Sequence, residues 1–391
     1  MSSHCSHCWP TRTSSHLTNH MEYYQEKFAR ILKPFVPRTK KQSNFWGNFL
    51  ELLAKLNLVE FVDNPDHSRL YNRSLIFFKE AKKRGLQIQA VKAFGKYDNS
   101  FKVFLKNKPV YYDGIPLNII GKKNNHDLDN KIEIKKLLQK NKLPVADGGL
   151  FTRMKEASQF AEIIGFPVIV KPNNGSLSHH VSGPIGNLKA LKSAIKIVQQ
   201  YRPDFIVEKF IRGKLYRATV IGKKHVFICR KEPANVVGNG KSTIAKLIEL
   251  KNQTRGKLEK LNETLHKIPV GTALKERLQL QRLNLNSVLP KEKKLYLQDK
   301  IILSTGCDVI ACTEITHENN INMFLHTAKI LNSDLVGIDF IGQNITKDFK
   351  NQTSAIIETN SLPYIDMHQY PSHGKAHPVA KIIWDSILKT S

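Results

Sequence analysis

The sequence contains no apolar stretch long enough to cross a bilayer. Its longest apolar runs, 167–170 and 335–341, are far shorter than the ~20 residues that a transmembrane helix needs. Residues 1–10 have no apolar core of the kind a secretory signal requires, so we expect none here. Because 41% of the residues are hydrophobic and 24% are charged, a fully disordered chain is also excluded. These absences favour a folded cytoplasmic protein.

Acidic residues are scarce. Asp and Glu total 33 against 61 Lys and Arg, which gives a formal net charge of +28. A field of this sign attracts polyanions such as nucleic acids, nucleotides and acidic metabolites. Long basic runs interleaved with aromatics are missing, however, and lysines on solvated helix faces would give the same total. Charge therefore does not by itself identify a partner.

Cysteine is also sparse, with five residues. Three lie in apolar or strand-like surroundings and are expected to be buried and reduced: Cys229, Cys307 and Cys312. Cys5 and Cys8 form a CxxC beside His4 and His7, which could supply half of a zinc site. No second pair lies at a fitting distance, so this segment is either half of a metal site or a polar terminus.

Three regions follow one another along the chain. Residues 1–41 are rich in Ser, Thr, His and Pro, and we expect a flexible basic tail. Residues 42–125 alternate helical and strand patterns and predict a small α/β domain. From residue 126 to 391, helices alternate with short apolar strands, interrupted by a Lys-rich, mostly helical insertion at about 241–300. The fold class predicted from this pattern is α/β, in the α+β sense.

Acidic and amide side chains mark the ends of two expected strands. Asp339 lies in the strand 335–341, and Glu358 and Asn360 lie in and just beyond the strand 354–358. Residues two apart in a strand point to the same face. Three hard oxygen donors would suit Mg²⁺, which takes one or two carboxylates plus phosphate oxygens. Solvated strand ends or lysine partners are the alternative interpretation.

Two other strand ends carry groups that suit a nucleotide. Lys171 ends an apolar strand and precedes the loop 172–176, which could wrap a phosphate. The segment 205–213 is a buried strand that runs into a turn, and such a connector can offer backbone hydrogen bonds and an apolar wall to an adenine ring. Each piece is ambiguous alone, but their order along the chain is informative.

This order resembles the ATP-grasp superfamily, in particular the ATP-grasp domain of cyanophycin synthetases and bifunctional glutathione synthetases. The likeness runs from about residue 129 to 388. The segments that carry it are 129–131, 143–145, 168–172, 207–213, 216–222, 230–240, 250–252, 303–306, 337–339, 358–363 and the tail 367–374. The resemblance implies two α+β subdomains gripping ATP, preceded by the small α/β domain.

The resemblance also implies a role for each matching residue. Lys131 and Lys171 would hold the ATP phosphates. Glu208 would bond the adenine amino group, and the backbone of the hinge would close over the base. The hinge residues are Lys209, Phe210 and Ile211.

The same resemblance assigns the metal and the acyl group. Asp339, Glu358 and Asn360 would hold Mg²⁺, for which Mn²⁺ could substitute. Arg217 and Arg230 would lie over the γ-phosphate and the acyl group, with Arg230 as the clamp of an acidic first substrate.

The function implied is an ATP-dependent carboxylate–amine ligase that forms amide or peptide bonds through an acyl phosphate. Its substrates would be small amino acids or acidic peptides; a membrane partner is not expected, and a homo-oligomer is left open. One alternative is a polyanion or nucleic-acid binder on an ATP-grasp scaffold, motivated by the cations of 241–300 such as Lys251 and Arg255. An ATP-grasp kinase and a nucleotide-binding pseudoenzyme are the others.

Three positions depart from the subgroup's pattern. The loop 176–180 has polar and bulky residues where glycines are usual. Leu215 stands where an acid often binds the ribose, and Asn239 replaces the aspartate of a Gly-Asp-Gly. None of these departures involves the predicted metal ligands.

Overall fold

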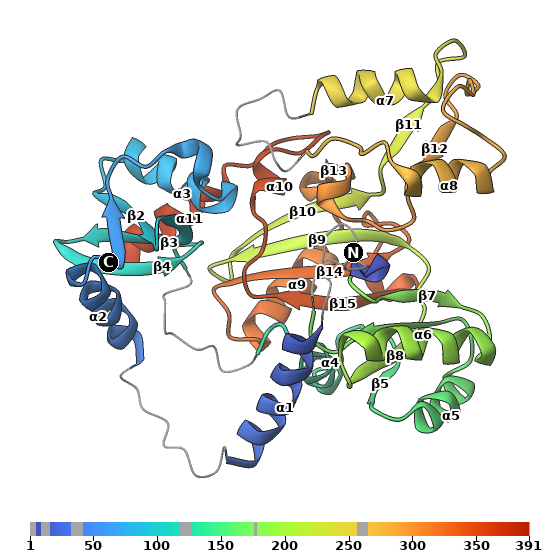
Figure 1. The fold of residues 1–391 in the computed structure, drawn as a ribbon, viewed down its shortest axis with the longest axis horizontal. Coiled ribbons are helices and arrows are strands. Elements are labelled where there is room, and N and C mark those ends of the chain that lie inside the picture. The colour runs from blue at the N-terminus through green and yellow to red at the C-terminus, as the bar shows by residue number, and fades with distance from the viewer. Residues whose placement is uncertain are drawn as a thin grey trace. The chain divides into compact units, whose positions relative to one another are not determined.

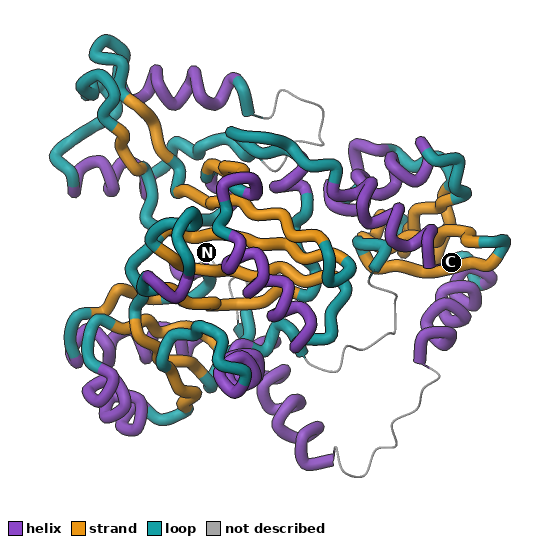
Figure 2. Tube along the Cα trace, turned by 180° about the vertical axis from the view of Figure 1, so that it is seen from behind, coloured by secondary structure: helices purple, strands orange, loops and turns teal. Residues whose placement is uncertain are grey.

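The computed structural model describes residues 5–8, 16–32, 42–117, 127–175, 178–255 and 265–390 (Figures 1 and 2). The chain forms two compact units, each assembled from separate segments. Unit 1 comprises Met1–Lys40, Asn125–Lys214 and Ile338–Thr359. Unit 2 comprises Lys41–Asn124, Leu215–Gly337 and Asn360–Ser391. Among the described residues, no helix has the length and apolar character that a bilayer crossing requires.

The centre of unit 1 is a four-stranded antiparallel sheet in the order β5–β8–β6–β7. Its strands are β5 (Gly148–Phe151), β6 (Val168–Pro172), β7 (Ser182–Ile185) and β8 (Phe205–Lys209). Helices α5 (Met154–Ile164) and α6 (Leu188–Tyr201) share a hydrophobic core with this sheet. Helix α6 buries Leu191, Ala194, Ile195 and Val198, the spacing of one helical face.

Two further helices of unit 1 bring side chains to this sheet. Helix α4 (Lys131–Lys140) begins at Asn130, whose side chain accepts a hydrogen bond from the Glu133 amide at 3.2 Å. Helix α1 (Leu17–Leu32) follows the short 3-10 helix η1 (Ser6–Cys8). Glu26 on α1 accepts from Arg202 at 2.5 Å and thereby joins the amino-terminal segment to the end of α6.

Unit 2 contains the sheet β1–β2–β3–β4, which is antiparallel throughout. Its strands are β1 (Val59–Val62), β2 (Ile88–Ala93), β3 (Lys96–Leu105) and β4 (Lys108–Asp113). Three helices belong with them: α2 (Gln42–Lys55), α3 (Asn72–Lys83) and α11 (Val379–Thr390). Helices α3 and α11 share one core with the sheet, in which the Trp384 indole N–H donates to the Phe77 carbonyl at 3.1 Å.

The sheet with the order β13–β10–β9–β14–β15 is made of strands that are shared between the two units. Its strands are β9 (Lys214–Ile221), β10 (His225–Glu232), β13 (Asp308–Ala311), β14 (Leu335–Gly342) and β15 (Ser354–Asn360). Strands β9 and β10 form a hairpin across Gly222, which has φ of 58°. Helices α9 (Glu318–Ile330) and α10 (Asp366–Gln369) contact β10.

The predicted insertion has a hydrophobic core of its own. It is built from helices α7 (Ile244–Gln253) and α8 (Thr272–Leu280) and from the antiparallel pair β11 (Asn235–Val237) and β12 (Lys294–Tyr296). The other short 3-10 helices of the chain's described part are η3 (His67–Arg69), η5 (Leu303–Thr305), η6 (Thr313–Ile315) and η7 (Phe349–Asn351).

Candidate functional site

Glu208 lies in β8, between β5 and β6, and only 4% of its surface is exposed. Its carboxylate pairs with two ammonium groups: Lys171 Nζ at 2.6 Å and Lys135 Nζ at 2.8 Å. Burial alone would raise the pKa of Glu208, but the two lysines hold this pKa below its usual value. The carboxylate is therefore ionised and fixes both ammonium groups in place.

Lys135 is a member of this cluster that the sequence analysis did not identify. It follows Lys131 by one turn of α4 and donates to the Ala146 carbonyl at 2.6 Å. Burial lowers the pKa of Lys135, and the charge of Glu208 opposes that shift. A signal was present in the sequence, because Lys135 interrupts the apolar stripe of α4 at a position where a lysine needs a buried partner.

A cavity of about 190 Å³ opens beside this cluster, within unit 1. Lys131 Nζ donates to the Gly175 carbonyl at 2.9 Å and lies 3.7 Å from Glu358 Oε1. Lys171 Nζ also donates to the Ile357 carbonyl at 3.2 Å. The cavity is lined by Lys131, Ile169, Lys171, Pro172, Gly175, Ser178, His179, Val181, Glu208, Lys209, Phe210, Ile211, Ile341, Ile357 and Glu358. The lining thus combines three lysines with several apolar side chains, which suits a ligand with an anionic part and a flat apolar part.

The predicted hinge forms one wall of the cavity. Its first residue, Lys209, is fixed by hydrogen bonds of both its side chain and its backbone. The Lys209 ammonium donates to the carbonyls of Ile164, Gly165 and Phe166 at 2.9–3.2 Å, where it offsets the negative end of helix α5. The Lys209 amide donates to the Asp147 carbonyl at 2.8 Å. The side chain of Lys209 is thus occupied within the protein.

The predicted metal ligands lie on neighbouring strands. Asp339 on β14 is 7% exposed, and Glu358 on β15 faces the cavity. Ile341, two residues after Asp339 and therefore on the same face of β14, lines the same cavity. Among the described residues, the buried Nδ2 of Asn360 has no hydrogen-bond partner. The carboxylates of Asp339 and Glu358 are hard oxygen donors of the kind that Mg²⁺ prefers.

The register of the β9–β10 hairpin separates the two predicted arginines. Arg217 is opposite Cys229, whereas Arg230 is opposite Tyr216. Opposed residues share a face and successive residues alternate, so Arg217 and Arg230 point to opposite faces of the hairpin. The two arginines therefore leave the hairpin in opposite directions. Lys231, which the sequence analysis did not select, is on the face of Arg217 and is 9% exposed.

Arg217 is buried where β9 approaches the start of β14. A Cβ at Gly337 would lie 2.8 Å from Arg217 Nη1, so this guanidinium requires a glycine there. On the same face of β9, Thr219 Oγ1 lies 2.8 Å from Nε2 of the buried His368. Burial and the charge of Arg217 lower the pKa of His368 to about 3. His368 is consequently a neutral hydrogen-bonding group.

Arg230 lines a second cavity, of about 490 Å³, within unit 2. Arg230 Nη2 lies 3.5 Å from Glu232 Oε1, and its buried Nε has no hydrogen-bond partner among the residues that the structure describes. The lining residues are Arg230, Glu232, Asn235, Val236, Val237, Leu247, Lys251, Lys294, Asp308, Ile310 and His373. An unsatisfied guanidinium N–H in a cavity is a ready donor for an anionic group.

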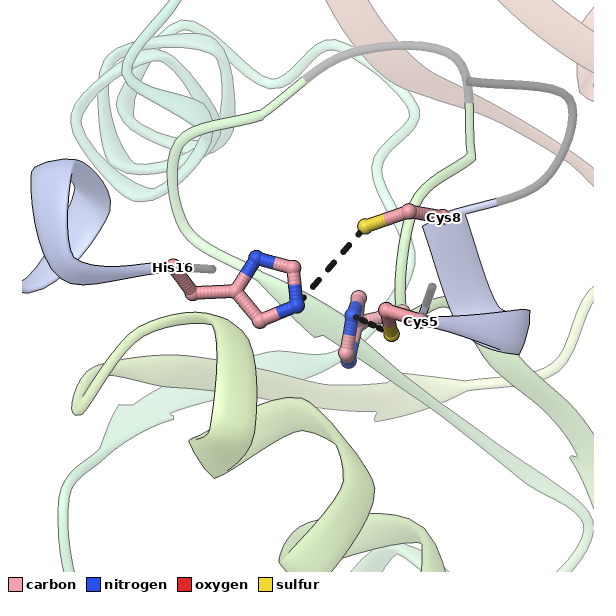
Figure 3. Close-up of side chains that lie close together, drawn as sticks. Cys5, Cys8 and His16 are labelled. Carbon is pink, nitrogen blue, oxygen red and sulfur yellow. Dashed lines mark hydrogen bonds between the residues drawn. The ribbon is translucent and has the colours of Figure 1, made fainter. Parts of the chain in front are cut away.

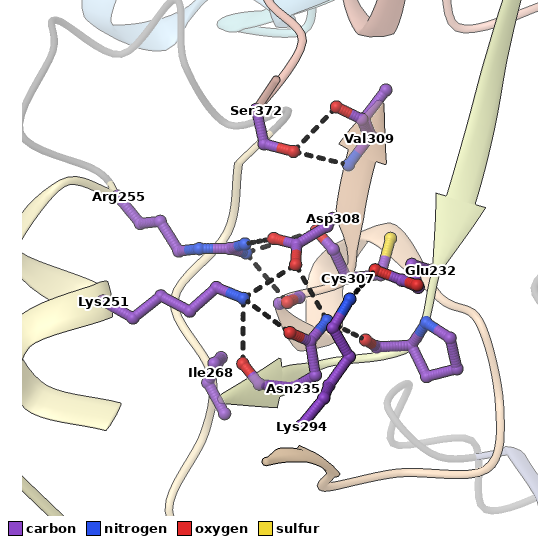
Figure 4. A network of polar contacts seen from close by, with 12 residues as sticks. Glu232, Asn235, Lys251, Arg255, Ile268, Lys294, Cys307, Asp308, Val309 and Ser372 are labelled. Carbon is purple, nitrogen blue, oxygen red and sulfur yellow. Dashed lines mark hydrogen bonds and ion pairs between the residues drawn. The ribbon is translucent and has the colours of Figure 1, made fainter. Parts of the chain in front are cut away.

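The floor of this second cavity is a buried ionic network around Asp308 (Figure 4). Asp308 accepts from Lys251 Nζ at 2.7 Å and from Asn235 Nδ2 at 2.8 Å, and it also pairs with Arg255. Burial lowers the pKa of Lys251, and Asp308 counteracts that shift. Lys251 and Arg255 were two of the cations that motivated a polyanion-binding surface, but here they point inward. This arrangement weakens that alternative.

The structure describes two of the three positions that depart from the subgroup's pattern and only part of the third. Ser176 and Leu177 of the phosphate loop lie outside the described residues. Leu215 is half-buried at the start of β9. Asn239 Oδ1 accepts from the amides of Lys241 at 3.0 Å and Ser242 at 2.8 Å, so its side chain closes a turn before α7.

The architecture of the two units is the ATP-grasp fold, as predicted from the sequence. A solved bifunctional glutathione synthetase from Pasteurella multocida superposes with a TM-score of 0.64 and 21% identity, covering 83% of this chain and 44% of that one. At this identity the likeness establishes the fold alone. No family model matches the chain.

Curated relatives confirm the predicted resemblance in sequence. Cyanophycin synthetase of Trichormus variabilis is 29% identical over 260 residues, which are 66% of this chain and 29% of that protein. The glutathione biosynthesis bifunctional protein GshAB of Clostridium perfringens is 30% identical over 264 residues, 67% of this chain and 34% of that protein. The chain thus spans about a third of the length of the curated relatives it matches.

Proposed function

We propose that this chain is an ATP-dependent carboxylate–amine ligase that forms amide or peptide bonds through an acyl phosphate. The observation that carries the proposal is the cavity of unit 1, which combines Lys131, Lys171 and Glu358 with the apolar hinge. A chain with the ATP-grasp fold and this cavity has the charges and the shape that a magnesium nucleotide needs. Its similarity to two kinds of synthetase supports the reaction class.

The adenine ring is assigned to the hinge side of the cavity. The amides of Lys209 and Phe210 already donate to the carbonyls of Asp147 and Pro167, at 2.8 and 3.0 Å. We therefore assign the base-binding amide to Ile211, which also lines the cavity. Glu208 would accept the adenine amino group with a lone pair that its two lysine partners leave available.

The phosphates are assigned to two lysines of the same cavity. Lys131 and Lys171 would bind phosphate oxygens, and Asp339, Glu358 and Asn360 would hold Mg²⁺ or Mn²⁺. When bound, the ion neutralises charge on the β- and γ-phosphates. Phosphoryl transfer depends mainly on such positioning and charge compensation.

The chemical steps balance without a covalent enzyme intermediate. A substrate carboxylate oxygen attacks the γ-phosphorus, and the bond to the β-phosphate oxygen breaks to release ADP. An amine then attacks the acyl carbon of the acyl phosphate; phosphate leaves and the amine loses a proton. Arg217, on the face that approaches Gly337 of β14, is assigned to the charge that develops in these steps.

Arg230 requires a different role, because the hairpin register turns it away from Arg217. In its cavity Lys251 pairs with Asp308 and Lys294 pairs with Glu232 at 2.9 Å, which leaves Arg230 as the cation with spare donors. We assign Arg230 to a remote carboxylate of an acidic substrate rather than to the reacting one. An acidic amino acid or acidic peptide in the cytoplasm is the substrate class that fits.

The decisive experiment measures ADP release by the full chain against a panel of amino acids and acidic peptides. Mass spectrometry of each reaction identifies the product. An amide that forms only when acid, amine and ATP are present is the expected result. A phosphorylated acid that persists without amide would instead establish a kinase, and binding of ATP with no product would establish a pseudoenzyme. Salt-sensitive binding of arbitrary DNA, indifferent to ATP, would support the polyanion binder.

A further inference from the structure

Four metal-ligating side chains of unit 1 converge outside the nucleotide cavity. They are Cys5, Cys8, His16 and His180, and one ligand atom from each lies within 4.8 Å of those of the others. Cys5 Sγ is 3.3 Å from His180 Nε2, and Cys8 Sγ is 3.8 Å from His16 Nε2. Figure 3 shows the Cys8 sulfur directed at the His16 ring, with Cys5 beside them.

The donor set and its spacing match one particular metal geometry. Two thiolates and two imidazoles are a common ligand set of structural zinc sites. Zinc–sulfur and zinc–nitrogen bonds of the usual lengths, directed to the corners of a tetrahedron, place the donor atoms roughly 3.3–3.8 Å apart. The two measured distances fall in this range, and two thiolates would neutralise the charge of the ion.

The surroundings of His180 prepare it to be a ligand. Its Nδ1 lies 2.7 Å from the Ile197 carbonyl, which can only accept, so the ring proton is on Nδ1 and the lone pair of Nε2 faces Cys5. His180 is 1% exposed, so the surrounding residues hold its ring in this orientation. A hydrogen bond from the other ring nitrogen to a carbonyl oxygen orients zinc-bound histidines in general.

The backbone also joins the two segments that supply the ligands. The His180 amide donates to the His7 carbonyl at 3.2 Å, which binds the segment carrying Cys5 and Cys8 to the loop after β6. Cys8 is completely buried although the surrounding sequence is polar. The rings of His16, His180 and Tyr201 pack against one another beside the two cysteines, with centroids 4.8–5.3 Å apart.

We propose that Cys5, Cys8, His16 and His180 bind one Zn²⁺ in a closed tetrahedral structural site. The site ties Cys5, Cys8 and His16 to the end of the loop between β6 and β7. Ser178, His179 and Val181 of this loop line the nucleotide cavity on either side of His180. Zinc would therefore fix the loop that forms one wall of that cavity. Residues 176–180 of this loop lack the usual glycines.

The first test is the zinc content of the full chain purified without added metal, measured by inductively coupled plasma mass spectrometry. One zinc ion per chain is expected. The double variant Cys5→Ser with Cys8→Ser should lose it, and His180→Ala should retain much less than the wild type. His20→Ala is the matched control, because His20 lies in the same segment but outside the ligand set; it should retain the metal.

The second test uses only the wild-type chain, so that misfolding of a variant cannot obscure the result. Replacement of the metal by Co²⁺ should give the intense visible bands of a tetrahedral cobalt site together with thiolate-to-cobalt charge-transfer absorption. Modification of the thiols should release the metal to a chromogenic chelator. Both readouts are independent of ligase activity, so a negative result for zinc would not count against the proposed function, and a negative result for the ligase would not count against zinc.

Three outcomes would overturn the proposal. A metal-free chain that binds added Co²⁺ without these bands would exclude the site. Retention of zinc by the double cysteine variant would place the metal elsewhere. A Cys5–Cys8 disulfide, detected by mass spectrometry of the chain isolated under non-reducing conditions, would assign the CxxC to redox chemistry instead.

Discussion

Lys135 and Glu208 form an ion pair of 2.8 Å between helix α4 and strand β8, and both side chains are almost completely buried. The pair fixes the carboxylate that also binds Lys171 at 2.6 Å. Buried charges of this kind are costly to desolvate, so removing one partner leaves the other poorly compensated. The position of Lys171 thus depends on Lys135, a residue of helix α4 that pairs with the same carboxylate.

The first prediction concerns Lys135→Met. We expect the free energy of unfolding to fall by about 3–5 kcal/mol, because Glu208 would lose one of its two buried countercharges. Chemical denaturation monitored by circular dichroism measures this change. The control is Lys136→Met, since Lys136 is exposed on the same helix and should change stability by less than about 0.5 kcal/mol. Equal losses of unfolding free energy in the two variants would contradict the buried ion pair between Lys135 and Glu208.

The second prediction concerns the metal ligands. Asp339→Asn and Glu358→Gln should each lower turnover by roughly two orders of magnitude, since bound metal contributes several kcal/mol of charge stabilisation. The Mg²⁺ concentration needed for half-maximal rate should rise at the same time. Asp334→Asn, an exposed acid just before β14, should leave both values unchanged. Full turnover in the double variant Asp339→Ala with Glu358→Ala would remove the magnesium assignment.

The third prediction separates the two arginines. Arg230→Ala should raise KM for the acidic substrate by about 10–100-fold, because the substrate would lose a hydrogen bond to a charged group. We expect little change in kcat or ATP affinity. Arg217→Ala should instead lower kcat. Lys224→Ala, in the exposed turn between β9 and β10, is the control for the hairpin. If Arg230→Ala abolished ATP binding while acid affinity stayed constant, Arg230 would belong to the phosphate site.

The fourth prediction concerns pH and His368. Its pKa of about 3 in the folded chain lies below the ordinary 6.5, so below pH 6.5 the unfolded state takes up a proton that the folded state refuses. Stability present above pH 6.5 is therefore lost as the pH falls from 6.5 towards 3, at about 1.4 kcal/mol per pH unit. Arg217 and His377 are the charged and titratable groups that favour the neutral form.

The matching measurement compares wild type with His368→Gln, which can keep a hydrogen bond to Thr219. Between pH 7 and pH 5 the wild type should lose about 2 kcal/mol more of its unfolding free energy than the variant does. His326→Gln removes an exposed histidine of α9 and should behave as the wild type. Parallel pH profiles of wild type and His368→Gln would show that His368 titrates normally.

The sequence revealed the parts of the candidate site that depend on local pattern. Asp339, Glu358 and Lys171 were found because acids and lysines at the ends of apolar strands are conspicuous, and alternation within a strand predicts their faces. The hinge was found in the same way, as a buried strand that ends in a turn. In the structure Lys171, Glu358 and the hinge residues line one cavity, and Asp339 lies on β14 beside the strand of Glu358.

Features that depend on distant pairing were missed. Lys135 could not be matched to Glu208, which is 73 positions later, without knowing that α4 lies against β8. The opposite faces of Arg217 and Arg230 depend on the exact register of the β9–β10 hairpin, which a shift of one residue would reverse. The CxxC was recognised as half of a zinc site, but His180 is separated from Cys5 by 175 positions, far beyond any spacing rule.

The core shared by α3, the first sheet of unit 2 and α11 has a consequence for synthesis of the chain. Phe77 is covered by Trp384, so the sheet formed by residues 59–113 cannot complete its core until residues some 270 positions later have left the ribosome. At the usual translation rate of about 5–20 residues per second, that interval is roughly tens of seconds. During this time Phe77 and the part of α3 that packs against α11 lack their partner, so this part of the core stays incomplete although α3 can already pack on the sheet.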